Sequence, residues 1–296
     1  MAVADWPPIE KMFTSTTPGR ALASRFVAGD NLAEAVAVAR RLNDDGCLVS
    51  LDLLGEEVAD RESAGHAVAE YLECLDQIES QGLDGNISIK PTQLGLAFDE
   101  ELANQALERL GKRAAEIGTT VTIDMEDSRY TEATVRMFER GQAGTQNFGI
   151  AIQAYMKRTA TDLERLGGLG GHIRLCKGAY VEPSEIAITT KAGVDGAFAV
   201  YLTELMMRRD VTPAIATHDE ELVALALDLA KDRDESFEFQ MLYGVRGDLQ
   251  SRILEEGHPL RIYLPFGSQW YPYLTRRVAE RPANVWFFVK ALIGSR

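Results

Sequence analysis

Eight short β-rich runs, separated by segments with helical periodicity, are the feature of this 296-residue sequence that most restricts its fold. The intervening segments, such as 101–118 and 220–234, repeat their apolar residues at helical spacing. Strands that alternate with helices indicate βαβ units and a parallel sheet. The runs span residues 47–54, 86–90, 120–125, 148–154, 172–178, 212–218, 237–242 and 260–266.

Eight βα units in about 250 residues are typical of a (β/α)8 barrel. The main alternative, an open doubly wound sheet, usually has a glycine-rich turn after its first strand, whereas only Gly55 follows the first run here. Residues 6–20 and 31–45 have the pattern of extra helices. We therefore predict a single domain in which N-terminal helices (1–45) pack on a catalytic barrel (46–296) that includes the C-terminal helices.

The composition excludes several classes of protein. With 45 acidic and 31 basic residues the net charge is −14, which argues against nucleic-acid binding. Three cysteines without a C-x-x-C pair suit a reducing cytosol, and the first residues lack the features of a secretory signal. No apolar run reaches the ~18 residues of a membrane span. The nearest, 285–294, predicts a buried terminal helix, with contact to a membrane surface as the alternative.

Functional residues of such barrels lie at the C-terminal ends of the strands. The glycine-rich stretch 167–171 leads into the fifth run and therefore lies at the opposite, structural face. Charged groups inside a parallel sheet are costly unless they are paired, so polar residues on nearly every strand end predict a site. These residues are Lys90, Asp124, Gln153, Arg174, Lys177, His218, Asp219, Gln240 and Tyr263.

The sequence offers little for a metal centre. Its four histidines (66, 172, 218 and 258) do not fall on neighbouring strand ends, so a histidine-rich site is not expected. Asp124, Glu126 and Asp127 are suitable Mg²⁺ ligands, although solvated loop carboxylates are the commoner explanation of such a group.

Two lysines leave the chemistry open at this point. Lys90 and Lys177 could each form a Schiff base if burial lowered the amine pKa. Alternatively, Arg174, Lys177 and Gly178 suit an anionic cofactor, because they combine positive charge with close backbone approach.

A helix predicted at 271–282 follows the eighth run and therefore begins at the functional rim, over the barrel mouth. Tyr273, Arg276, Arg277 and Glu280 share one of its faces. Two adjacent guanidinium groups are suited to binding one carboxylate. The alternative is a solvated outer helix with weak surface ion pairs.

The sequence resembles the proline dehydrogenase family in several separated motifs. They are "ISIKPTQLG" (87–95), "IRLCKGAY" (173–180), "IATHDE" (215–220), "EFQMLYG" (238–244) and "YLPFGSQWYPYLTRRVAERPANVWF" (263–287). The resemblance runs from about the first strand to the C-terminus and is closest to the short monofunctional bacterial type. It implies a distorted TIM barrel with noncovalently bound FAD. It also implies oxidation of L-proline to Δ1-pyrroline-5-carboxylate, with the electrons passed to a membrane quinone.

The resemblance also implies roles for individual residues. Those expected to surround the substrate are Lys90, Asp124, Tyr180, Leu242, Tyr263, Tyr273, Arg276 and Arg277. Those expected to bind the flavin are Met125, Ala151, Gln153, Arg174, Lys177, Gly178, Ala179, Thr190, Lys191, Ala216, His218, Asp219, Gln240 and Glu280. The implied setting is cytoplasmic, with peripheral contact at the inner face of the cell membrane and a separate pyrroline-5-carboxylate dehydrogenase as a partner in catabolism.

Three departures from the family pattern bear on the site. Val181 stands where many bifunctional relatives have an aromatic residue, Asp219 stands at a position often filled by Asn, and the segment between Tyr263 and Tyr273 is shorter. The alternatives that remain are a Schiff-base lyase, a non-catalytic carboxylate-binding barrel, and a dehydrogenase for 4-hydroxyproline or another cyclic imino acid. Tyr263 favours proline, because relatives that prefer 4-hydroxyproline tend to have a smaller residue there.

Overall fold

A computed structural model describes residues 23–279 of the chain, with side chains up to residue 275. Its centre is a closed barrel of eight parallel strands that pair in sequence order. The predicted (β/α)8 barrel is therefore confirmed, and each predicted run coincides with a strand to within two residues at either end. The strands are Leu48–Leu53 (β1), Gly85–Ile89 (β2), Val121–Ile123 (β3), Phe148–Gln153 (β4), His172–Cys176 (β5), Thr212–Ala216 (β6), Glu238–Leu242 (β7) and Leu260–Phe266 (β8).

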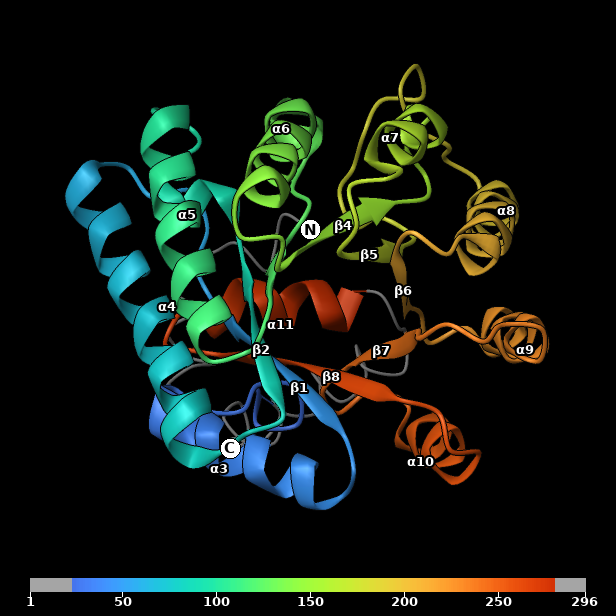
Figure 1. Cartoon of the computed structure of the whole chain (residues 1–296), viewed down its shortest axis with the longest axis horizontal. Helices are drawn as coiled ribbons and strands as arrows, with labels where there is room; N and C mark the ends of the chain where they lie inside the picture. Colours follow the sequence, from blue (N-terminus) through green and yellow to red (C-terminus); the bar gives the residue numbers. More distant parts are fainter. Residues whose placement is uncertain (1–22, 280–296) are drawn as a thin grey trace, which may run out of the picture.

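Helices surround the barrel (Figure 1). They are Leu32–Asp44 (α3), Arg61–Gln81 (α4), Glu100–Glu116 (α5), Ser128–Gly144 (α6), Thr159–Leu166 (α7), Lys191–Met207 (α8), Glu220–Ala230 (α9), Gly247–Glu255 (α10) and Trp270–Ala279 (α11), with a short 3₁₀ turn at Pro91–Leu94 (η1). As predicted for 31–45, α3 is helical, and it packs on β1 and β8. The predicted helix at 6–20 lies outside the described residues.

The last described helix, α11, begins four residues after β8 ends and lies across the ring of strands (Figure 1). This is the helix predicted over the barrel mouth. Within 23–279, no helix is both long enough and apolar enough to cross a bilayer. The apolar segment 285–294 lies outside the described residues.

The two faces of the sheet differ sharply in polarity. Successive side chains of a strand point to opposite faces. On β2, Ile87 and Ile89 belong to the apolar core, whereas Asn86 and Ser88 are buried but hydrogen-bonded to polar groups of other strands. The buried polar residues of the barrel include Ser50, Asp52, Asn86, Ser88, Thr122, Gln153, Arg174 and Gln240.

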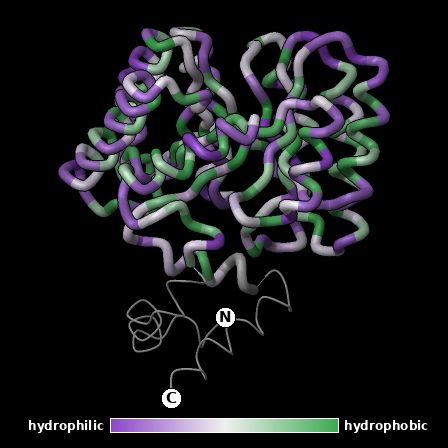
Figure 2. Tube along the Cα trace, turned by 90° about the horizontal axis from the view of Figure 1, so that it is seen from below, coloured by the Kyte–Doolittle hydropathy of each residue, from purple (hydrophilic) through white to green (hydrophobic). Residues whose placement is uncertain are grey.

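The apolar core thus lies between the sheet and the helices, while the barrel interior is polar. Figure 2 shows hydrophilic and hydrophobic residues alternating along the outer helices, as expected when one helix face packs on the sheet. Most barrels of this class fill their interior with branched apolar side chains. A polar interior costs desolvation energy unless its groups are hydrogen-bonded.

Hydrogen bonds satisfy the buried polar side chains at the N-terminal end of the barrel interior. Ser50 bonds to Asn86, whose amide donates to Thr122 Oγ1 at 3.3 Å. Thr122 Oγ1 lies 2.7 Å from His172 Nε2, and burial lowers the pKa of His172 to about 4, so the ring is neutral. The ring fits because residue 149 is a glycine: a Cβ there would lie 1.9 Å from His172 Nε2.

We expect Gly149→Ala to destabilise the fold by about 1–3 kcal/mol, because the new methyl group would overpack the His172 ring. Urea unfolding measures this loss. When His172→Ala is also present, Gly149→Ala should lower the free energy of unfolding clearly less than it does alone, because the clashing ring is gone. Equal costs in the two backgrounds would contradict this explanation of the glycine.

Candidate active site

Asp124, just after β3, is the centre of a hydrogen-bond network inside the barrel. Its Oδ1 accepts from Ser88 Oγ at 2.8 Å and from Nη1 of Arg174, and its Oδ2 accepts from the Tyr263 hydroxyl at 2.7 Å. The Arg174 guanidinium carbon lies 5.1 Å from the centre of the Tyr263 ring, a cation–π distance. Four strands therefore bring one carboxylate, one cation and one phenol together.

Arg174 is also held from a second side. Its Nε donates to Oε1 of Gln240 at 2.5 Å, and Nη1 donates to Ser88 Oγ at 3.0 Å. Its Nη2 is buried and has no hydrogen-bond partner within the described residues. A buried guanidinium nitrogen in this state is costly, so it marks a place where a ligand acceptor would be favoured.

Lys90 forms a buried ion pair that the sequence did not predict. Its Nζ lies 2.5 Å from Oδ1 of Asp52 on β1, and the two side chains are 11% and 1% exposed. Burial lowers the pKa of Lys90, but the charges of Asp52 and Asp124 outweigh it and the net shift is upward. The neutral amine that a Schiff base needs is therefore disfavoured at Lys90.

A second cluster joins two lysines and two aspartates at the C-terminal ends of β5 and β6. Lys177 Nζ lies 2.5 Å from Asp195 and 2.7 Å from Asp219. Lys191 Nζ lies 2.5 Å from the other oxygen of Asp195 and 3.9 Å from Asp219. Thr190, which precedes α8, caps that helix by accepting from Gly193 N. The cluster has no net charge.

A hydrogen bond to Gln153 holds the loop after β5 against the end of β4. Gln153 donates to the carbonyl of Glu126 at 3.0 Å and accepts from Ala179 N at 3.4 Å. Gly178 has φ +119°, and a Cβ there would lie 2.3 Å from the Tyr155 ring. This glycine is thus required by backbone conformation and by Tyr155, a reason different from the expected close approach of a cofactor.

The remaining predicted residues lie in different surroundings. His218 Nε2 accepts from Leu242 N at 2.9 Å, which places the proton of the neutral ring on Nδ1. Tyr273 is buried in an apolar cluster with Trp270 and Leu274, and its role at the substrate remains a prediction. Arg276 and Arg277 lie in α11, but the structure describes only their backbone. Glu280 lies outside the described residues. Met125 and Ala151 are buried, Tyr180 and Ala216 are half-buried.

The structure adds two residues that sequence reasoning did not assign to the site. Asp52 and Ser88 point into the barrel, and the signal that could have identified them is the alternation along β1 and β2. Glu126, considered from sequence as a Mg²⁺ ligand, instead accepts from Thr92 N at 2.9 Å and from Thr92 Oγ1 at 2.6 Å, which ties the loop after β3 to η1.

The alternative of a magnesium site gains no support. Asp124 is paired with Arg174, Asp127 is paired with Arg129, and Glu126 is bonded to Thr92. In the range 23–279 no three acidic, histidine or cysteine side chains are grouped as a metal site would require.

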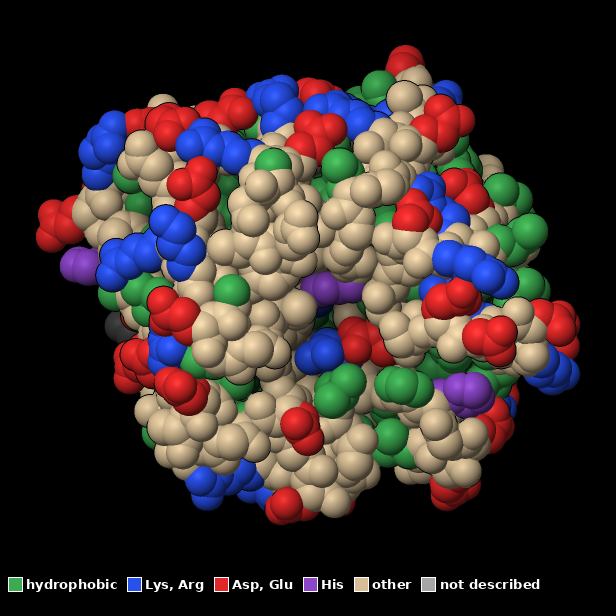
Figure 3. Space-filling model, in the orientation of Figure 1, with side chains coloured by type: hydrophobic (Ala, Val, Ile, Leu, Met, Phe, Trp, Pro, Cys, Tyr) green, Lys and Arg blue, Asp and Glu red, His purple; other side chains and the backbone are tan. Residues whose placement is uncertain are grey.

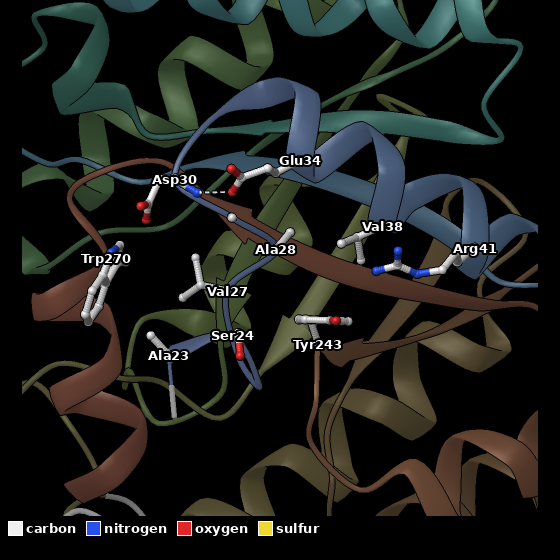
Figure 4. A pocket seen from close by; sticks show the side chains of 11 residues that line it. Ala23, Ser24, Val27, Ala28, Asp30, Glu34, Val38, Arg41, Tyr243 and Trp270 are labelled. Atoms are coloured by element: carbon white, nitrogen blue, oxygen red, sulfur yellow. Dashed lines mark hydrogen bonds between the residues drawn. The ribbon is translucent and has the colours of Figure 1, made fainter. Parts of the chain in front are cut away.

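A pocket of about 280 Å³ lies away from this chemistry (Figure 4). It is lined by the segment 23–30 together with Glu34, Val38, Arg41, Tyr243 and Trp270, none of which belongs to the predicted site. We favour the barrel mouth as the active site because its buried ionisable groups converge there. On the face in Figure 3, basic and acidic side chains are intermingled, without the continuous basic surface that nucleic acid requires.

Comparison with known proteins identifies the family. The family model described as "Proline dehydrogenase" matches residues 35–290. The chain belongs to the proline dehydrogenase family. It is 36% identical over 274 residues to proline dehydrogenase 1 of Bacillus subtilis, covering 92% of this chain and 90% of that one. It is 33% identical over 304 residues to proline dehydrogenase of Deinococcus radiodurans, covering 99% and 96%. The family resemblance read from the motifs is thereby confirmed.

Solved structures support the fold. Proline utilization A (PutA) from Bdellovibrio bacteriovorus matches with a TM-score of 0.82 and 23% identity over 88% of this chain. The PutA of Bradyrhizobium japonicum matches with a TM-score of 0.78 and 24% identity over 92%. The chain spans about a third of the length of these larger proteins, 33% and 32% respectively.

The pKa of Glu126 gives a prediction about stability. Burial raises this pKa to about 7, against opposing hydrogen bonds from Thr92. Between pH 5 and 7 the folded protein therefore holds a proton on Glu126 that the unfolded chain has lost. Because the folded state is the one that binds this proton, the free energy of unfolding falls as pH rises through that window, by up to about 3 kcal/mol. The neutral variant Glu126→Gln should lack this contribution. Urea unfolding at pH 5, 6, 7 and 8 tests it, and parallel pH curves for parent and variant would contradict the prediction.

Proposed function

We propose that this protein oxidises L-proline to Δ1-pyrroline-5-carboxylate with noncovalently bound FAD and passes the electrons to a membrane quinone. The observation that carries the proposal is the Arg174 guanidinium, fixed inside the barrel by Asp124 and Gln240 with one buried nitrogen unpaired. Family membership supports the substrate. A cytoplasmic location, with peripheral contact at the inner face of the membrane, follows from the proposed acceptor.

The residues present fit FAD. The unpaired Nη2 of Arg174 needs an acceptor, and the polar atoms of a flavin ring can provide one. Gln153, Ala179 and Gln240 would hold the ring, and Lys177 with Lys191 would meet the pyrophosphate. Bound there, FAD would supply the hydride acceptor.

The protein's own part in the reaction is to bind and orient proline. Oxidation removes a hydride from C5 and a proton from the nitrogen, which requires a fixed ring. Arg276 and Arg277 on α11 would bind the carboxylate, with Lys90 as a third cation. Asp52 keeps Lys90 charged, and Asp124 holds the Tyr263 hydroxyl at the wall of the site.

The lyase alternative is disfavoured. Lys90 has a raised pKa and is paired with Asp52, while Lys177 is paired with Asp195 and Asp219. Carboxylates therefore engage both amines, and neither is free to attack a carbonyl. No observation favours the non-catalytic carboxylate-binding barrel. The product, a cyclic imine in equilibrium with an aldehyde, would pass to a separate pyrroline-5-carboxylate dehydrogenase.

The decisive test is the visible spectrum of the purified protein, recorded without oxygen before and after addition of L-proline. A flavin spectrum that bleaches with proline is the expected result. Flavin that stays oxidised with proline but bleaches with 4-hydroxyproline would change the substrate. A colourless protein that cannot take up added FAD would overturn the proposal.

The carboxylate clamp gives a second prediction. We expect Arg276→Lys and Arg277→Lys each to weaken proline binding by about 2–5 kcal/mol, because a lysine cannot make the paired hydrogen bonds of a guanidinium. The dependence of flavin bleaching on proline concentration measures this. Arg252→Lys, on α10, is the matched control and should bind proline normally. Unchanged affinity in both rim variants would remove the clamp from the mechanism.

A third prediction concerns Asp219, whose carboxylate neutralises Lys177 in the expected pyrophosphate site. Asp219→Asn keeps the shape of the side chain and removes one negative charge, so FAD affinity should rise about five- to tenfold. Titration of the apoprotein with FAD, followed by flavin fluorescence, gives the Kd. Asp60→Asn is the control, because Asp60 also caps a helix but has no lysine partner among the described residues. Weaker binding by Asp219→Asn would show that its charge is not repelling the cofactor.

A further inference from the structure

A buried ion pair lies below the active site at the N-terminal end of the barrel interior. Arg261 on β8 donates to Glu238 on β7 through Nε at 2.8 Å and Nη2 at 3.0 Å, and its Nη1 donates to the carbonyl of Val49 at 2.9 Å. The two side chains are only 14% and 13% exposed. Burying two charges is expensive, and neither residue has a part in the reaction proposed above.

Gln240 connects this pair to Arg174. Its Nε2 donates to Oε1 of Glu238 at 2.5 Å, and its Oε1 accepts from Arg174 Nε at 2.5 Å. The orientation of the amide follows from the chemistry of its neighbours, because a carboxylate only accepts and a guanidinium nitrogen only donates. Glu238 therefore determines that the carbonyl end of Gln240 faces Arg174.

Glu238 is suited to this role across neutral pH. Burial raises its pKa, but the charge and hydrogen bonds of Arg261, together with His172 and the Gln240 amide, outweigh burial, so the pKa lies below its ordinary value. The carboxylate thus remains an acceptor for the Gln240 amide. His172 is a further titratable ring close to Glu238, and its own lowered pKa keeps it neutral.

The guanidinium of Arg174 is thereby held at both edges. Asp124 and Ser88 hold Nη1, Gln240 holds Nε, and Nη2 is left without a partner among the described residues. Without Glu238, the buried NH2 group of Gln240 would lose its acceptor, and an unsatisfied buried donor drives a side chain into another conformation.

We propose that Glu238 and Arg261 are positioning residues that aim the Arg174 guanidinium at the flavin by fixing the amide of Gln240. The inference rests on the proposed function, since it takes FAD as the ligand of Arg174. It assigns a purpose to an otherwise costly ion pair in the half of the barrel that lies away from the substrate.

The test is the double variant Glu238→Met/Arg261→Met, which removes the pair without leaving an unpaired charge. Replacing a buried ion pair by apolar side chains of similar size is often neutral or stabilising. This gain offsets the cost of the acceptor that the Gln240 amide loses, so the melting temperature should change little. The Kd of the apoprotein for FAD, from fluorescence titration, should nevertheless increase about tenfold. Loss of affinity without loss of stability is the signature of positioning.

Ser50→Ala is the matched control. Ser50 is fully buried in the same end of the interior, but its hydrogen bond goes to Asn86 and not toward Arg174. This variant should bind FAD like the parent. A similar loss of affinity in Ser50→Ala would attribute the effect to general loosening of the barrel and would overturn the inference.

The remaining outcomes separate the two proposals. FAD affinity in the double variant within twofold of the parent would overturn the positioning role and leave the proposed function standing. A parent chain that takes up no FAD would overturn the proposed function and this inference together. A double variant that melts well below the parent would mean that the pair stabilises the fold, and this too would count against positioning.

Discussion

A guanidinium group inside a parallel barrel must be paired, and the contact between Arg174 and Asp124 is the interaction on which the interior of this protein depends. Ser88 bonds to both members of that pair, Tyr263 bonds to Asp124, and Gln240 bonds to Arg174. These partners come from β2, β8 and β7, so the network fixes strands that are far apart in sequence. Closure of the sheet makes this possible, because only a barrel brings the inward faces of its strands within reach of one another.

The strand count and the clustering of polar residues inside the barrel could be predicted from sequence, because both follow from the local pattern of the strands. The loop 167–171 was also placed correctly at the structural end: Gly171 has φ +81° and a Cβ there would lie 2.3 Å from the carbonyl of Phe148. Partners that depend on register or on distant helices were not predictable. Asp52 meets Lys90 because it pairs in register with Ser88, and Asp195 reaches Lys177 from the fifth residue of α8.

Gly178 shows how a glycine can be required for a reason that its motif does not reveal. Its motif suggested close approach of a cofactor, and the geometry shows that the ring of Tyr155 occupies the space a side chain would need. Tyr155 N and the carbonyl of Lys177 are also hydrogen-bonded at 3.0 Å. Packing of this kind leaves no periodic signal, since the two residues lie in the loops that follow β4 and β5 and either could be exchanged without altering the pattern of the strands.

The division of the sheet into an apolar outer face and a polar inner face has a consequence for how such an enzyme can change. Ile87 and Ile89 contribute to the core that holds the helices, whereas Ser88, between them, contributes to the site. Folding and chemistry therefore use alternate residues of the same strand. Selection can therefore alter the inward residues, and with them the range of small molecules that the site accepts, while the outward residues keep the chain folded. The same barrel can in this way acquire new substrate specificities.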